Sequence, residues 1–95
     1  MSQAHVDALL VARERLKKNT NYTLFYALPD DKAGEELRTA VLNSLEGEGS
    51  LYAWIRKARG RGEWDDCDES VFNAKLLSTQ LAWVDQMIID WKDAP

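Results

Sequence analysis

Few side chains in this 95-residue sequence have the chemistry of a catalytic or metal-binding centre. It contains one histidine, His5, and one cysteine, Cys67. A closed structural zinc site takes four nitrogen or sulfur ligands, so one chain cannot build it from these two residues. His5 stands near the N-terminus, and we expect it to be a solvent-facing helix residue. Cys67 lies among carboxylates, a setting that makes a poor nucleophile, so we expect an inert or partly buried thiol.

The acidic run around Cys67 is the remaining candidate for cation binding. Carboxylate oxygens are ligands for hard cations, but the run lacks the spacing and the glycine of a calcium loop. The triplet from Gly60 to Gly62 lacks the third glycine and the preceding strand of a dinucleotide-binding loop, and no phosphate-binding P-loop motif occurs. The sequence therefore predicts a protein that is not an enzyme, with no catalytic residue, no metal and no cofactor.

Charge is ordered in blocks along the chain. Residues 50–62 carry four basic and no acidic side chains, and residues 63–95 carry eight acidic and two basic ones. The basic block is Arg56, Lys57, Arg59 and Arg61, and the acidic run that follows it contains Asp65, Asp66, Asp68 and Glu69. One interpretation is local, because each block complements the dipole of the neighbouring helix end and the two attract each other across a glycine turn.

The alternative interpretation treats both blocks as contact surfaces. Arginine donates paired hydrogen bonds to phosphate, and Tyr52, Trp54 or Trp64 would stack on bases, so the basic block is a candidate nucleic-acid contact. A sequence pI of about 4.9 argues against a dedicated nucleic-acid domain, whose pI often exceeds about 9. The acidic run would instead meet a basic site on a partner and accelerate association.

Trp64 is the one tryptophan of four that belongs to no periodic helix face. We expect the other three, Trp54, Trp83 and Trp91, to pack in the core. Trp64 lies between a glycine break and the acidic run, which leaves two alternatives. It folds back over the end of the helical bundle, or it is exposed and anchors an interface.

The amino-acid composition and the length limit the classes to which this protein can belong. Hydrophobic residues make up 45% and charged residues 29% of the chain, and the net charge is −4, values typical of a globular protein. The length fits a single domain spanning residues 1–95. No apolar run approaches the roughly 20 residues of a membrane helix, and no secretion signal is visible at the N-terminus. A single cysteine suits a reducing compartment, so we expect a cytoplasmic protein.

Helical periodicity predicts an all-α fold of about four helices. Apolar residues at helical spacing indicate a first helix at about 3–18. The segment from Tyr22 to Leu28 is aromatic and β-branched, but no strand of comparable quality could pair with it. We therefore expect a buried connection or a short helical extension there, and a strand completed by a second copy of the chain is the minority alternative.

Capping residues place the next two helices. Pro29 closes the aromatic segment, and Asp30 or Asp31 starts a helix that Gly47 and Gly49 end. Ser50 caps a shorter helix, and the glycine break that begins at Gly60 ends it.

The C-terminal helix is the longest that the sequence predicts. It extends from about Ser70 to Lys92, without glycine or proline. One apolar stripe consists of Leu77, Leu81, Val84, Ile88 and Trp91, and a second consists of Phe72, Leu76, Trp83 and Met87. A helix that is apolar over half its circumference is expected to be contacted from two sides, as the central helix of a bundle is.

Together these patterns favour a small acidic module that binds another protein as an adaptor, inhibitor or regulator. The expected partner contacts are Trp64, Asp65, Asp66, Asp68 and Glu69, with a second patch for phosphate or an acidic partner at Arg56, Lys57, Arg59 and Arg61. Self-association through Tyr22–Leu28 or the Leu77–Trp91 stripe is compatible with this function. The alternative is an accessory protein that binds nucleic acid through residues 56–61.

Overall fold

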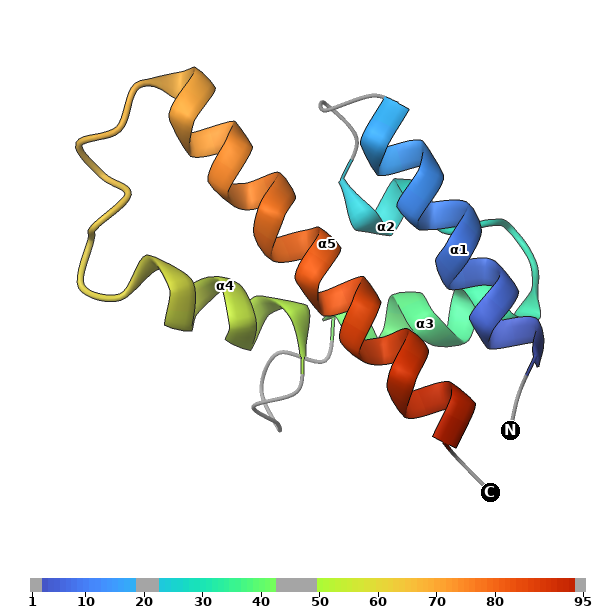
Figure 1. Cartoon of the computed structure of the whole chain (residues 1–95). Helices are drawn as coiled ribbons and strands as arrows, with labels where there is room; N and C mark the ends of the chain where they lie inside the picture. Colours follow the sequence, from blue (N-terminus) through green and yellow to red (C-terminus); the bar gives the residue numbers. More distant parts are fainter. Residues whose placement is uncertain (1–2, 19–22, 43–49, 94–95) are drawn as a thin grey trace.

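The computed structural model describes residues 3–18, 23–42 and 50–93, and these residues form five helices and no strand (Figure 1). The helices are α1 (Gln3–Lys18), α2 (Leu24–Ala27), α3 (Lys32–Leu42), α4 (Leu51–Arg59) and α5 (Glu69–Asp93). The predicted all-α bundle with a long C-terminal helix is confirmed. The fifth helix is the four-residue α2, which occupies the aromatic segment.

α1 and α5 lie side by side and form the largest helix pair of the fold. α1 begins and ends where its periodicity predicts, and its buried face contains Val6, Ala8, Leu9, Ala12 and Leu16. In α5, Trp83 and Val84 are fully buried, while Leu77, Leu81, Met87, Ile88 and Trp91 are half-buried and pack against the core. The two stripes of α5 are therefore used mainly for packing within the chain.

α2 is too short to be stable on its own backbone hydrogen bonds, and other helices hold it. Its first residue, Leu24, is fully buried and donates its backbone N–H to Gln80 Oε1 of α5 at 2.8 Å. Arginines of α1 and α3 donate to its backbone carbonyls: Arg15 to Ala27 at 3.1 Å, and Arg38 to Phe25 at 2.9 Å and to Leu28 at 2.6 Å. These bonds satisfy polar backbone groups that helix ends leave unpaired.

α3 begins as an aspartate-capped helix, as predicted. The side chain of Asp31 accepts a hydrogen bond from the backbone N–H of Gly34 at 2.8 Å. Gly34 itself is required by a close approach, because a Cβ at this position would lie 1.9 Å from the carbonyl oxygen of Pro29. Leu37 and Val41 are buried on the core side of the helix. The predicted end at Gly47 and Gly49 lies outside the described residues.

α4 has both of the predicted boundaries. Ser50 caps it by accepting from the backbone N–H of Ala53 at 3.1 Å. Gly60 ends it with φ 57° and ψ −130°, and Gly62 also has a positive φ of 89°. These left-handed conformations favour glycine, and they let the chain turn from α4 towards α5.

The core lies around the C-terminal two-thirds of α5. It joins buried residues of α1, α2 and α3 to Trp83 and Val84 of α5 and to Leu51 at the start of α4. The opposite end of the molecule consists of the last turns of α4, the turn at 60–68 and the first turns of α5 (Figure 1). None of the described helices combines the length and hydropathy needed to cross a membrane.

Candidate functional site

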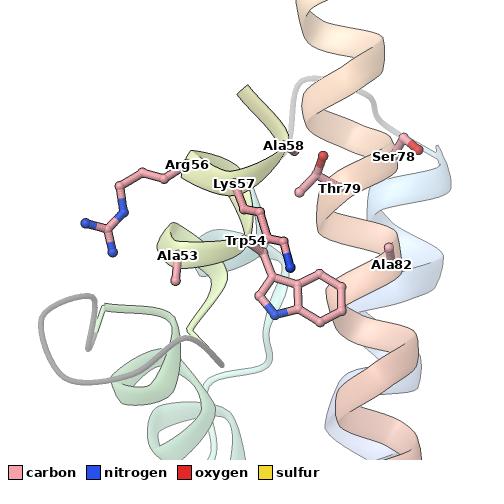
Figure 2. Close-up of a pocket in the computed structure, with 8 residues that line it drawn as sticks. All are labelled: Ala53, Trp54, Arg56, Lys57, Ala58, Ser78, Thr79 and Ala82. Carbon is pink, nitrogen blue, oxygen red and sulfur yellow. The ribbon is translucent and has the colours of Figure 1, made fainter. Parts of the chain in front are cut away.

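An open groove lies between α4 and the middle of α5. Its volume is about 780 Å³, and Figure 2 shows the side chains around it. The lining residues are Ala53, Trp54, Arg56, Lys57 and Ala58 of α4 and Ser78, Thr79 and Ala82 of α5. Cavities of several hundred Å³ lined by apolar and a few polar groups are the usual form of binding sites.

The α4 wall of the groove is made by an amphipathic helix. Leu51 is buried and Ile55 is half-buried against the core, so the remaining side of α4 faces outwards. Trp54 is half-buried at the boundary between these two sides. Figure 2 shows its indole extending towards α5, with the Lys57 side chain reaching down beside it. The indole thus forms part of the apolar floor, and the lysine provides charge next to it.

The α5 wall is made of small side chains. Ser78 and Ala82 are one helical turn apart and exposed on the same side of α5. Thr79 donates its hydroxyl to the backbone carbonyl of Lys75, at 2.9 Å, so this hydroxyl is turned to its own helix. The floor of the groove is therefore shallow and largely apolar on the α5 side.

The structure divides the predicted basic patch into two parts. Arg56 and Lys57 are exposed and line the groove. Arg59 instead turns to the following segment, where its guanidinium lies 3.3 Å from a carboxylate oxygen of Asp65 and 5.7 Å from the ring centre of Phe72. The ion pair between the two charge blocks is thus made by Arg59, and Lys57 lies exposed at the groove.

The predicted acidic patch is exposed. Asp65, Asp66, Asp68 and Glu69 all have exposed side chains, and Asp65 is the member that pairs with Arg59. The turn that carries them is ordered by backbone hydrogen bonds from the N–H of Asp65 to the carbonyl of Gly62 at 3.0 Å and from the N–H of Cys67 to the carbonyl of Trp64 at 3.2 Å. The patch is therefore held in a defined conformation beside the end of α4.

Trp64 is not an exposed anchor. Only 5% of its surface is exposed, and its ring packs edge-to-face on Phe72 of α5, with ring centres 5.6 Å apart. The sequence left two alternatives for Trp64, and the structure shows the one in which the indole folds back over the end of the helical bundle. The physical reason is the glycine turn, because the reversal at Gly60 and Gly62 carries the indole onto the first turns of α5. Trp64 therefore supports the acidic patch from beneath instead of presenting a ring to a partner.

The expectation for His5 was wrong. Its side chain is only 13% exposed, its Nε2 lies 2.6 Å from Glu36 Oε2 of α3, and its ring stacks on Trp91 of α5 with ring centres 3.9 Å apart. His5 lies four residues before Leu9 on the buried side of α1, so the periodicity of this helix favours burial, although both partners are distant in sequence. His5 therefore links three helices at one end of the core.

The predicted self-association surfaces are partly used within the chain. In the aromatic segment, Leu24 and Leu28 are buried and Tyr26 is 71% exposed, while Tyr22 lies outside the described residues. A smaller cavity of about 400 Å³ lies beside Tyr26 and Tyr52, between α2, α4 and α5. Association of two copies stays a prediction.

Two further findings concern chemistry at this site. Cys67 is partly exposed, and its Sγ lies 4.0 Å from the backbone carbonyl of Glu63. Across the described ranges, no three histidine, cysteine or acidic side chains come together in a way that would hold a metal ion.

Comparisons with protein-family models, with curated proteins and with solved structures found no match to this chain. The class that the structure defines is thus a small all-α protein with a basic-rimmed groove next to an acidic turn. The sequence predicted the charged residues of this site, but not Ser78, Thr79 and Ala82, whose small size on the outer side of α5 was the available signal.

Proposed function

We propose that this chain is a small non-catalytic module that binds another protein and acts as an adaptor, inhibitor or regulator. The observation that carries the proposal is the α4–α5 groove, which is open, largely apolar on its floor and lined by Arg56 and Lys57. The exposed acidic patch of residues 65, 66, 68 and 69 adds a second surface of opposite charge beside it. Such complementary patches guide association and partner choice.

The distribution of reactive side chains supports binding over catalysis. His5 is engaged by Glu36 and Trp91 on the far side of the core from the groove, and Cys67 lies in the acidic turn. An acid–base or nucleophilic centre needs such groups within hydrogen-bond reach of each other in a cavity. A cytoplasmic location, suggested by the single cysteine, is part of the same proposal.

The test is affinity capture of partners from native extract of the source cells, read out by quantitative mass spectrometry. The wild-type chain is compared with a double variant, Asp66→Lys with Asp68→Lys, and with a groove variant, Lys57→Glu. The matched control is Asp90→Lys with Asp93→Lys, which reverses two exposed charges elsewhere on α5. We expect a captured protein that persists after nuclease treatment and is depleted by at least one surface variant but not by the control. Capture that no surface variant alters would contradict the proposal.

The rival function is nucleic-acid binding by the basic block. One observation favours it, because Figure 2 shows the Lys57 amine beside the Trp54 indole, an arrangement able to hold a phosphate and stack on a base. The adjoining acidic patch opposes it, because its carboxylates would repel the same backbone. Labelled duplex and single-stranded oligonucleotides at low salt separate the two functions, since phosphate contacts weaken steeply as salt rises. Tight, salt-sensitive binding of either oligonucleotide would replace the proposed function.

A further inference from the structure

The α4–α5 groove is an open cavity bounded by two helices. Two packed helices leave a trough between them, and a helix laid in that trough buries an apolar stripe against both. The described residues contain no strand, so a partner cannot bind here by adding a strand to a sheet edge. The small side chains of Ser78 and Ala82 on one wall let another backbone approach closely.

The charged side chains around the groove indicate which charge a bound partner helix would carry. Lys57 lies on the α4 wall beside the Trp54 indole, whereas Figure 2 shows Arg56 extending away from α5. The exposed Lys75 lies one turn before Thr79 on α5. The acidic residue one turn beyond Ala82, Asp85, is already paired with Arg13 of α1 at 2.8 Å. The immediate surroundings of the groove are therefore cationic, although the whole chain carries a net charge of −4.

The difference between the cationic groove and the acidic patch limits how the charges of a partner can be distributed over its surface. A partner that is acidic on all sides would be repelled by the acidic patch, which adjoins the groove at the end of α4. A partner whose acidic side chains flank one apolar stripe would place them against Lys57 and Lys75 and avoid the patch. A helix in a groove is recognised through such a stripe at positions i, i+3, i+4 and i+7.

We propose that the α4–α5 groove binds an acidic amphipathic helix of a partner protein, with its apolar stripe on Trp54 and Ala82 and its carboxylates at Lys57. This inference rests on the proposed protein-binding function and names its partner class. α4 has nine residues and is about 14 Å long, so the groove accommodates two to three turns of the partner helix.

The test uses a fluorescein-labelled helical peptide of about 16 residues, long enough to form a helix in water. Leucines occupy its i, i+3, i+4 and i+7 positions and glutamates flank them, and a second peptide has lysine in place of every glutamate. We expect the glutamate peptide to bind in a salt-sensitive way, with amide shifts in NMR spectra confined to residues 53–58 and 75–82. The lysine peptide is expected to bind at least about tenfold more weakly.

Two groove variants have matched controls. Ala82→Glu adds bulk and negative charge to the floor, and Ala74→Glu makes the same change at an exposed α5 position outside the groove lining. Lys57→Glu reverses a charge in the last turn of α4, and Lys17→Glu does so in the last turn of α1. We expect at least about fivefold weaker peptide binding for each groove variant and less than about twofold change for each control. Thermal melts verify folding, and the two groove variants give independent readings.

Several results would overturn the inference. These are equal binding of both peptides, no binding of the glutamate peptide, displacement of it by a single-stranded oligonucleotide, or sedimentation showing that the groove is filled by a second copy of the chain. The proposed function fails separately. If Lys57→Glu leaves protein capture intact while Asp66→Lys with Asp68→Lys abolishes it, the module binds its partner through the acidic patch and only the groove inference is lost.

Discussion

The indole of Trp64 closes the end of the molecule where the chain turns from α4 into α5. It is buried in a turn, outside any helix, and Phe72 is its aromatic neighbour. Because two glycines with positive φ precede it, the turn has little intrinsic preference for this conformation, and packing of the indole stabilises it.

Trp64→Ala is expected to lower the free energy of unfolding by about 3 kcal/mol, the cost of removing a large buried aromatic side chain. Trp64→Phe keeps an aromatic contact with Phe72 and should cost less. Denaturant titration followed by circular dichroism measures both. Equal stability of wild type and Trp64→Ala would show that the turn does not depend on the indole.

His5 joins the beginning of α1 to α3 and to the end of α5. Its ring plane lies 6° from that of Trp91, and a carboxylate of Glu36 is 2.6 Å from its Nε2. His5→Ala removes both contacts and is expected to lower the free energy of unfolding by about 1 kcal/mol. Urea unfolding checks this value. Glu36→Gln, which alters a half-exposed partner, is the control and should cost less than about 0.5 kcal/mol.

These two residues mark the limit of prediction from single positions. Trp64 lies in no periodic element, so the sequence left its burial open, and only the glycine turn decides it. The spacing of His5 from Leu9 places it on the buried side of α1, but it does not identify Trp91, which comes from the other end of the chain, as the partner. Contacts between residues distant in sequence depend on how the helices pack against one another. The spacing of apolar residues within one helix does not determine this packing.

At the scale of elements, the sequence predicted the ends of a helix well where a capping side chain or a glycine close to that end determines it. Ser50 caps α4 through its own side chain, Asp31 does so for α3, and Gly60 ends α4 through its backbone conformation. The secondary structure of the aromatic segment, Tyr22–Leu28, could not be predicted from such local signals. α2 depends on bonds from side chains that lie between 10 and 56 residues away, so its helical state follows from the tertiary structure.

The bond from Leu24 to Gln80 gives a test of this dependence. Gln80 is 4% exposed, and Gln80→Leu would leave the backbone N–H of Leu24 buried without its acceptor. We expect a loss of about 2 kcal/mol in unfolding free energy. Gln86→Leu is the matched control on the same helix, since Gln86 is exposed and bonds to Asp90, and it should change stability by less than about 0.5 kcal/mol. Similar losses for both variants would contradict the role of Gln80.

At the scale of the whole molecule, stability is distributed unevenly along α5. Its middle is fully buried by α1 and the core at Trp83 and Val84, whereas its first turns are covered on one side by Trp64 and Arg59. The principal dimensions of 42, 29 and 19 Å reflect this extension beyond the core. The groove was not predictable from the sequence, because it depends on how α4 packs against the middle of α5.

We expect amide hydrogens of residues 74–77 to exchange at least about tenfold faster than those of residues 83–86, after correction for intrinsic rates. The reason is that opening the first half of α5 exposes the groove side, while opening the second half exposes the core. Native-state hydrogen exchange by NMR measures the difference. Uniform protection along α5 would show instead that the helix opens as one unit.

The dependence of α2 on its neighbours also has a consequence for folding order. The backbone N–H of Leu24 finds its acceptor on Gln80, so the hydrogen bonding of α2 is complete only after the C-terminal helix has docked. During synthesis the chain up to that helix leaves the ribosome first, and the backbone N–H of Leu24 then lacks its acceptor. We therefore expect chaperones to bind the apolar segment of residues 24–28 in a nascent chain until α5 has folded against the rest of the protein.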